Sequence, residues 1–344
     1  MVFFLTYFFD EKSGVGAQRS KSLYEFLTKR MDSDVRVFSK DDSMIKSPLL
    51  WGVLAFFYAL RSNHKIIYIS CGPYLNLLPL ILLKFFSNKK IVIDFRDPWS
   101  FNIKSGYGKG RTNIFRYIIS VLFERISYKY CDIFVVCTIG MKDYYSQVFK
   151  DSKKIRYIAN GHQVPIHLYK EREKRGLLEK ENLKVICIGK LMSYNNESLI
   201  EKLKLKIENI QKGNNNAIFT FIGSEGKDYF DQYFSKEVMK NFCFIDKLPY
   251  KEAIKHASVS DIGILTLRDE NMEYGTKIFD YIGLGLPVLD IFDNKKIFFE
   301  KFKFSFLNVE EIISINDSIN YSREVTNKKI YNVISSLIAE EENE

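Results

Sequence analysis

One segment near the carboxyl end of the chain combines a glycine-containing loop, a lysine and a carboxylate: residues 273–289, which read EYGTKIFDYIGLGLPVL. Gly275 and Thr276 lead into a predicted helix whose first turn presents Lys277 and then Asp280. Residues three positions apart share one face of a helix, and the N–H groups of its first turn attract anions. The segment therefore predicts a site where the lysine and the backbone hold a diphosphate and the carboxylate accepts hydrogen bonds from ribose hydroxyls. A capped surface helix without a ligand is the structural alternative.

A second group of charged residues lies in residues 91–99, which read IVIDFRDPW. Asp94, Arg96 and Asp97 follow a predicted buried strand, where charged groups are costly unless they have partners. In open α/β sheets, ligands bind beyond the carboxyl ends of the strands. One of these carboxylates could accept a proton from a hydroxyl, or could hold Arg96 against a phosphate. An ion pair that only closes the strand is the alternative.

A third and weaker pattern is formed by Gly14 and Gly16 in the stretch SGVGAQR, between the first predicted strand and a helix. Glycines at this place let the backbone approach a ligand, and the following helix N-terminus favours a phosphate. A tight turn without a ligand would need the same glycines, so both interpretations stay open.

Short apolar runs with strand character alternate with longer helical stretches along the chain. Strands are predicted at residues 2–7, 35–38, 66–70, 91–94, 133–137, 155–158, 185–188, 218–222, 242–245, 262–267 and 287–290. Helices are predicted at residues 18–30, 49–60, 75–86, 115–130, 141–149, 197–210, 250–257, 277–284 and 327–344. Continuous apolar strands separated by helices are typical of parallel sheets covered on both faces.

The alternation of strands and helices restarts after a polar, strongly charged stretch at residues 166–182, which is the predicted linker. The sequence thus predicts an α/β fold with two doubly wound, Rossmann-like domains, residues 1–165 and 183–326. The last stretch, residues 327–344, is predicted to be one amphipathic helix with an acidic end.

The charge of the chain is unevenly distributed. Residues 1–165 carry 25 Lys and Arg against 13 Asp and Glu, a net of +12, whereas the whole chain carries +9. A basic first half indicates an anionic partner, and both a phospholipid surface and nucleic acid have the required negative charge. A basic face that is only solvated, with no anionic partner, is the alternative. No nucleic-acid recognition motif is present, so nucleic acid is not expected.

The five cysteines form no CxxC pair and no cluster with histidines, so we expect buried, reduced thiols and no metal site. No run reaches the about 20 apolar residues that span a membrane. The start of the chain lacks the features of a secretory signal, so a cytoplasmic location is expected. The two apolar helices at residues 49–60 and 75–86 suit either the core or the inner face of the cell membrane.

The segment GTKIFDYIGLGLPVL resembles the donor-binding motif of GT-B glycosyltransferases of the large group 1 class (family four), which commonly reads P-[ST]-K-[LIV]-[FY]-E-Y-x-A-x-G-x-P-V. DFRDPW is similar to a segment of members that build capsule and O-antigen polysaccharide. The stretch IGKL resembles the opening of the second domain, where basic residues such as Lys190 meet donor phosphates. The resemblance covers nearly the whole chain. It implies two domains facing across a cleft, with the final helix returning to the first.

Three positions depart from the family pattern. Gly275 stands where proline is common, which we expect to be a small change, and Asp280 replaces glutamate with a shorter side chain. The E-x7-E pattern is offset, because the residue eight positions before Asp280 is Met272 and Glu273 is one position away. Glu273 is nevertheless assigned to the donor site.

The resemblance implies transfer of a sugar from a nucleoside diphosphate sugar, UDP-linked, to a glycan or lipid-linked acceptor, with retention and without a cofactor. Lys190, Lys277 and backbone N–H groups near Gly16 would stabilise the departing diphosphate, while Asp97, or less directly Asp94, would act on the acceptor. The offset E-x7-E pattern leaves one alternative, an inactive relative that binds the donor or serves as a partner subunit.

Overall fold

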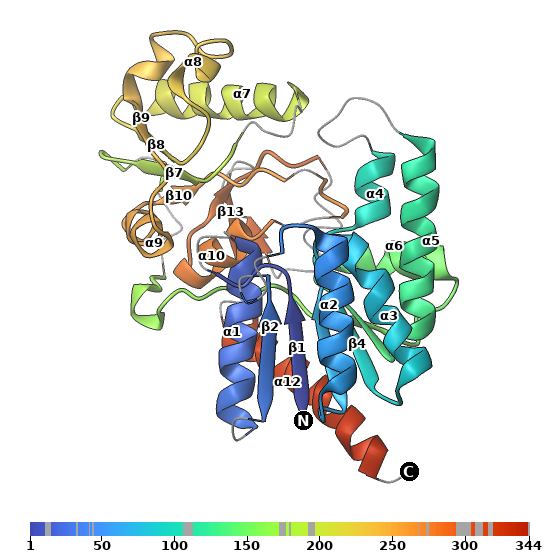
Figure 1. Cartoon of the computed structure of the whole chain (residues 1–344). Coiled ribbons are helices and arrows are strands. Elements are labelled where there is room, and N and C mark those ends of the chain that lie inside the picture. The colour runs from blue at the N-terminus through green and yellow to red at the C-terminus, as the bar shows by residue number, and fades with distance from the viewer. Residues whose placement is uncertain are drawn as a thin grey trace. The chain divides into compact units, whose positions relative to one another are not determined.

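The structure, a computed structural model, describes residues 1–10, 15–31, 34–40, 42, 45–105, 113–171, 177–178, 180–191, 197–267, 269–272, 275–293, 304–306, 312–315 and 319–342. The chain divides into two compact units (Figure 1). Unit 1 comprises Met1–Asn160 and Arg323–Glu344, and unit 2 comprises Gly161–Ser322.

Unit 1 is built on a six-stranded parallel sheet with the order β2-β1-β3-β4-β5-β6. Its strands are β1 (Val2–Thr6), β2 (Val35–Ser39), β3 (Ile66–Ser70), β4 (Lys90–Phe95), β5 (Ile133–Val136) and β6 (Ile155–Tyr157). Its helices are α1 (Val15–Arg30), α2 (Pro48–Arg61), η2 (Tyr74–Asn76), α3 (Leu77–Phe86), α4 (Trp99–Lys104), α5 (Ile114–Tyr130), α6 (Ile139–Phe149) and α12 (Arg323–Glu342). Every residue of β1 and β3 is buried, as expected for parallel strands that are covered on both faces.

The two chain ends meet in unit 1. Leu23 and Leu27 of α1 share a buried cluster with Ile330 and Ile334 of α12 and with apolar side chains of the sheet. The side chain of Asn327 donates to the carbonyl oxygen of Ser22 at 3.1 Å. The final helix is therefore part of the core of unit 1.

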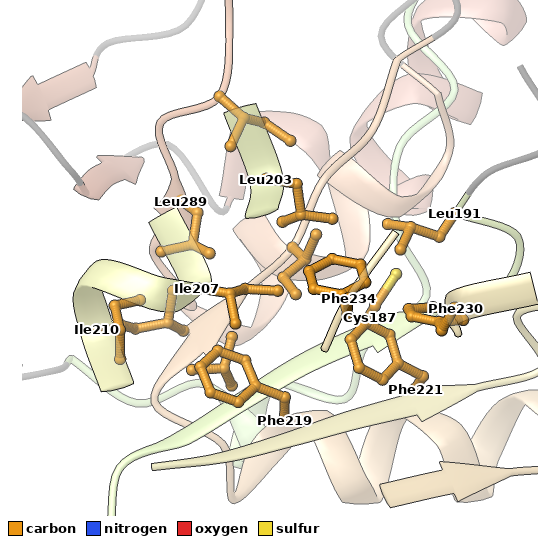
Figure 2. Close-up of a cluster of buried hydrophobic side chains, with 14 of the residues drawn as sticks. Cys187, Leu191, Leu203, Ile207, Ile210, Phe219, Phe221, Phe230, Phe234 and Leu289 are labelled. Carbon is orange, nitrogen blue, oxygen red and sulfur yellow. The ribbon is translucent and has the colours of Figure 1, made fainter. Parts of the chain in front are cut away.

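Unit 2 has a seven-stranded sheet with the order β12-β13-β11-β10-β7-β8-β9. Its strands are β7 (Lys184–Ile188), β8 (Ile218–Ile222), β9 (Phe242–Ile245), β10 (Ile262–Gly263), β11 (Val288–Leu289), β12 (Phe304–Phe306) and β13 (Ile312–Ile315). Its helices are η3 (Ile166–Leu168), α7 (Glu197–Gly213), α8 (Lys227–Phe230), η4 (Val238–Asn241), α9 (Tyr250–Ser258), α10 (Lys277–Leu284) and η5 (Ile319–Tyr321). Figure 2 shows α7 side chains such as Leu203 and Ile207 lying over Phe219 and Phe221 of β8.

The predicted α/β class with two doubly wound, Rossmann-like units is confirmed. The unit 2 sheet is mixed, because the two strands that were not foreseen, β12 and β13, pair antiparallel at its edge. The strand predicted at residues 262–267 is also wrong in length, since β10 ends at Gly263 although the following apolar residues stay buried. Of the five cysteines expected to be buried, Cys243 is exposed because it lies on the edge strand β9.

Candidate active site

Asp94 lies at the end of β4 and is only 1% exposed. The guanidinium of Arg19, from α1, donates to both carboxylate oxygens: Nε to Oδ2 at 2.9 Å and Nη2 to Oδ1 at 3.1 Å. The hydroxyl of Tyr68, on the neighbouring strand β3, also donates to Oδ2 at 2.8 Å. The sequence suggested Arg96 as the ion-pair partner, but the structure places Arg19 there, 75 positions away.

The Arg19–Asp94 pair is buried on both sides. Burial by itself lowers the pKa of the Arg19 guanidinium, but the charge of Asp94 outweighs this and raises the pKa above its usual value. Burial first, and the Asp94 charge second, raise the pKa of the Tyr68 hydroxyl well above its usual range. The arginine therefore stays charged and the tyrosine stays protonated at all physiological pH values.

Arg19 also connects strand ends that are far apart in the sequence. Its Nη1 donates to the carbonyl oxygen of Ala159 at 3.0 Å and to Oδ1 of Asn160 at 3.1 Å, just after β6. One side chain thus fixes α1 against the carboxyl ends of β4 and β6. Sequence reasoning missed Arg19, although its spacing of four from Leu23, itself four from Leu27, places it on the buried stripe of α1.

Asp97 and Arg96 lie in the turn that follows β4. Asp97 is exposed, and its carbonyl oxygen accepts a hydrogen bond from the hydroxyl of Tyr74 at 2.8 Å. The Tyr74 ring stacks on Trp99 with ring centroids 4.9 Å apart, which holds the turn from its other end. Arg96 is half-buried and donates to the carbonyl oxygen of Cys71 at 3.3 Å. Of the two predicted carboxylates, Asp97 is therefore the one accessible to a substrate.

A buried carboxyl group that the sequence did not single out supports this turn. Glu124 of α5 is fully buried and accepts hydrogen bonds from the backbone N–H of Ser100 at 2.9 Å, from the Ser100 hydroxyl, and from the hydroxyl of Tyr145 at 2.8 Å. Burial raises the pKa of Glu124 to about 7, although these hydrogen bonds oppose the shift. Because Ser100 follows Asp97 by three positions, Glu124 fixes the far end of the turn that carries Asp97.

In unit 2, the helix predicted at residues 277–284 is confirmed as α10, Lys277–Leu284. Thr276 occupies the position before the first helical residue. Gly275 has φ +62°, a left-handed conformation that proline cannot adopt because its ring fixes φ near −65°. The exchange of the family's proline for Gly275 is therefore not the small change expected from the sequence.

Lys277 and Lys190 are brought together at the carboxyl end of β7. The ammonium Nζ of Lys277 donates to the carbonyl oxygen of Lys190 at 2.6 Å. Gly189 has φ +72°, and a Cβ at this position would lie 3.4 Å from Cε of Lys277. The Lys277 side chain therefore lies next to Gly189, whose positive φ suits glycine.

Asp280, one helical turn after Lys277, accepts a hydrogen bond from the hydroxyl of Tyr250 at 2.6 Å. Tyr250 is the first residue of α9, so the tyrosine fixes the carboxylate from a neighbouring helix. On the buried side of α10, the Tyr281 hydroxyl lies 3.2 Å from the carbonyl oxygen of Ile264 and accepts a hydrogen bond from the N–H of Ile188 at 3.3 Å. These contacts attach α10 to the sheet and hold the Lys277 and Asp280 face at its carboxyl edge.

The remaining predicted site residues are less defined. Gly14 and Glu273 lie outside the described residues. Gly14 and Gly16 belong to unit 1, where Gly16 is the second residue of α1, whereas the other residues of the predicted donor set belong to unit 2. Within the described ranges, no three His, Cys, Asp or Glu side chains are grouped so that they could hold a metal ion.

No known family model matches the chain, and no curated protein matches it in sequence. Solved structures do match. Sucrose-phosphate synthase from Thermosynechococcus elongatus aligns with a TM-score of 0.61 and 14% identity, over 84% of this chain and 80% of the other. Anabaena HepE in complex with UDP and glucose aligns with a TM-score of 0.54 and 13% identity, over 84% and 80%. The lipopolysaccharide outer core galactosyltransferase WaaB aligns with a TM-score of 0.56 and 12% identity, over 84% and 80%.

Because these identities are low, the structural similarity is evidence for the fold of the chain and not for its reaction. The order of the strands in both sheets, the two Rossmann-like units and these structural matches together show that the chain has the GT-B fold.

Proposed function

We propose that the chain is a glycosyltransferase that moves a sugar from a nucleoside diphosphate sugar, UDP-linked, to an acceptor hydroxyl. The observation that carries this proposal is the row of Lys190, Lys277 and Asp280 at the carboxyl edge of the unit 2 sheet. This row offers the Lys277 ammonium, helical N–H groups and the exposed side chain of Lys190 beside them to a diphosphate, and a positioned carboxylate to ribose. The similar HepE structure contains UDP and glucose, which supports the choice of donor.

The two lysines are the groups that would act on the departing nucleotide. When the bond between the sugar and the diphosphate breaks, negative charge builds up on the diphosphate, and ammonium groups fixed beforehand stabilise it. In the described state Lys277 donates to a backbone carbonyl, a neutral acceptor that a phosphate oxygen would replace. Asp280 would hold the ribose, which orients the donor but does not take part in bond breaking.

Asp97 is the residue that we assign to the acceptor. Its exposed carboxylate could accept the proton of the attacking hydroxyl, or orient that hydroxyl. Asp94 has another role in this proposal, because Arg19 and Tyr68 occupy both of its oxygens and it positions the strand ends. Arg96 would contribute positive charge beside Asp97. Retention of configuration and a lipid-linked or envelope glycan as acceptor complete the proposal, with the family resemblance as their support.

The test is to incubate the purified chain with UDP-, GDP- and dTDP-sugars and a membrane lipid extract, and to measure nucleotide release. We expect release from one donor. Lys277→Ala should lower the rate by about 10²- to 10³-fold through lost charge stabilisation. Asp97→Asn should lower it by about 10²- to 10⁴-fold through loss of a proton acceptor.

Two exposed residues away from the proposed site provide matched controls. Lys236→Ala and Asp143→Asn remove the same groups and should leave the rate unchanged. Release that survives Asp97→Asn would disprove the role given to Asp97. If no donor is turned over, calorimetry decides: donor binding without turnover would identify the inactive relative, and absence of binding would overturn the proposed donor site.

A further inference from the structure

Three neighbouring helices of unit 1 expose a large amount of apolar surface. α2 packs against α3, and α3 packs against α5 (Figure 1). α2 and α5 each expose five large hydrophobic side chains, α3 exposes four, and η2 before α3 adds Leu75. Together they form what we call the apolar face: Leu49, Leu50, Val53, Phe57 and Tyr58; Leu75, Leu78, Leu82, Phe85 and Phe86; Ile114, Phe115, Ile118, Ile119 and Leu122. Soluble monomers rarely expose contiguous apolar patches of this kind unless the patch binds something.

The three helices differ in what they bury. On α5 the buried positions are Ser120, Glu124, Ser127 and Tyr128, whereas Phe115 is 75% exposed. On α2 the buried residues are Trp51 and three small ones, while other large apolar residues face solvent, and α3 has apolar residues on both its buried and its exposed side. A helix normally buries its apolar stripe and exposes its polar one. The exposed apolar residues are therefore not the edge of a core, because the core contacts are made by other positions.

The apolar face carries positive charge and no exposed negative charge. α2 and α3 contain no acidic residue, and the single acid of α5, Glu124, is fully buried. The exposed stripe of α5 continues from Leu122 into Arg125 and Lys129 at spacings of three and four, so these cations lie on the same side of the helix. The stripe of α2 likewise ends in Arg61, four positions after Phe57.

A basic pocket adjoins the carboxyl end of the α5 stripe. It has a volume of about 550 Å³. Its lining includes four basic residues, Arg125, Lys129, Lys150 and Lys154, and a single carboxylate, Asp151. A pocket with this charge suits the phosphate of a lipid headgroup, which is anionic and accepts several hydrogen bonds.

The apolar face also reaches the turn that carries Asp97. Leu75, which is 49% exposed, follows Tyr74, whose hydroxyl donates to the carbonyl oxygen of Asp97. At the other side, α4 packs against the first half of α5, with Trp99 in edge contact with Phe123 at 6.0 Å between centroids. A molecule that covers the apolar face therefore borders the exposed carboxylate.

We infer that the apolar face docks unit 1 onto an anionic lipid bilayer, with its apolar side chains among the acyl chains and its cations at the headgroups. Amphipathic helices bind membranes in this way, with their apolar side about 5–10 Å deep. No helix in the described ranges is long and apolar enough to cross a bilayer, so the contact would be made from one side. The inference does not depend on the proposed reaction.

A second copy of the chain is a less suitable occupant. In a symmetric dimer the same patch meets itself, so the cations at Arg61, Arg125 and Lys129 would face one another without acidic partners. An anionic bilayer offers both an apolar interior and the opposite charge. Each Lys or Arg near such a surface adds to the attraction.

The inference is tested by co-sedimentation of the full chain with vesicles in the absence of any donor. Vesicles of phosphatidylglycerol and phosphatidylcholine in equal parts should bind the chain, and phosphatidylcholine alone should bind it much more weakly. The variant Leu50→Gln/Phe86→Gln/Phe115→Gln changes one exposed residue on each helix and should weaken binding by more than about tenfold. Arg125→Glu/Lys129→Glu should weaken binding to the anionic vesicles in particular.

The control variant Ile166→Gln/Leu205→Gln/Val259→Gln changes three equally exposed apolar residues of unit 2 and should bind like the unchanged chain. Absence of vesicle binding, or binding that the helix variant retains, would overturn the inference. A dimer seen by sedimentation velocity without lipid, and abolished by the helix variant, would overturn it in favour of a second copy. Because no donor is present, these outcomes are independent of whether the chain transfers a sugar.

Discussion

The ammonium of Lys277 lies 2.6 Å from the carbonyl oxygen of Lys190, and the Lys277 side chain lies next to Gly189. Two residues that are 87 positions apart in the sequence thus meet at the end of one strand. This contact joins the first strand of unit 2 to the helix that carries Asp280. It is the geometric basis for assigning the diphosphate to this edge of the sheet.

Gly189→Ala is predicted to weaken donor binding through Lys277. A Cβ at φ +72° is strained by about 1–2 kcal/mol, and it would touch Cε of Lys277 at 3.4 Å, an ordinary van der Waals distance. We expect about a tenfold increase in the Kd for UDP, measured by calorimetry. In the Lys277→Ala background the same exchange should have little further effect, because coupled residues are not additive. Fully additive losses would show that Gly189 acts independently of the lysine.

Tyr250→Phe is predicted to weaken UDP binding modestly, by about 3- to 10-fold, because a hydrogen bond worth about 1 kcal/mol no longer orients Asp280. Asp280→Asn should have a larger effect. A UDP analogue that lacks both ribose hydroxyls is the informative control. If Asp280 holds the ribose, neither variant should change the affinity for this analogue, and an equal loss for both ligands would contradict that role.

Removing one partner of the Arg19–Asp94 pair is predicted to destabilise unit 1 strongly. Arg19→Met leaves the carboxylate buried without its charged partner, which should cost about 3–5 kcal/mol of unfolding free energy. Adding Asp94→Asn removes the buried charge and should recover much of this loss. Both tryptophans of the chain, Trp51 and Trp99, lie in unit 1, so tryptophan fluorescence during denaturation reports this unit. No recovery in the double variant would argue against a charge effect.

Glu124 is predicted to make the stability of unit 1 depend on pH. Burial raises the pKa of Glu124 from 4.5 in the unfolded chain to about 7, so the folded unit binds the proton more tightly. The contribution of Glu124 to the free energy of unfolding is therefore most favourable below pH 4.5. It falls by at most about 3 kcal/mol as the pH rises to about 7, and it is constant above that pH. Other titrating groups also contribute, so the measured quantity is a difference between two variants.

Glu124→Gln mimics the protonated acid and should remove this part of the pH dependence. We expect the difference in stability between the variant and the unchanged chain to shift in favour of the variant between pH 5 and pH 8. Tryptophan fluorescence melts at the two pH values measure it. A difference that does not change with pH would show that Glu124 ionises normally in the folded unit.

The α/β class, the two doubly wound units and the position of α10 could be predicted from the sequence because each depends on local patterns. Apolar strands that are buried on both faces show as continuous runs, and the helices between them show as periodic ones. The motif around Lys277 could also be recognised from the sequence, because its glycine, lysine and carboxylate lie within six positions. Strands β12 and β13 were not predicted, because they pair antiparallel and therefore lie outside the alternation of parallel strands and helices on which the prediction was based.

The tertiary structure alone decided which charged groups are partners. Asp94 is paired with Arg19 and not with its sequence neighbour Arg96, because α1 packs across the strand ends where β4 finishes. It also decided which side of α5 is buried. The sequence pattern favours burial of residues such as Ile118 and Leu122, yet the fold buries Ser120 and Glu124, because Glu124 satisfies the backbone and hydroxyl of Ser100. Side-chain periodicity defines two faces of a helix, but the partners available in the folded chain determine which of the two faces solvent.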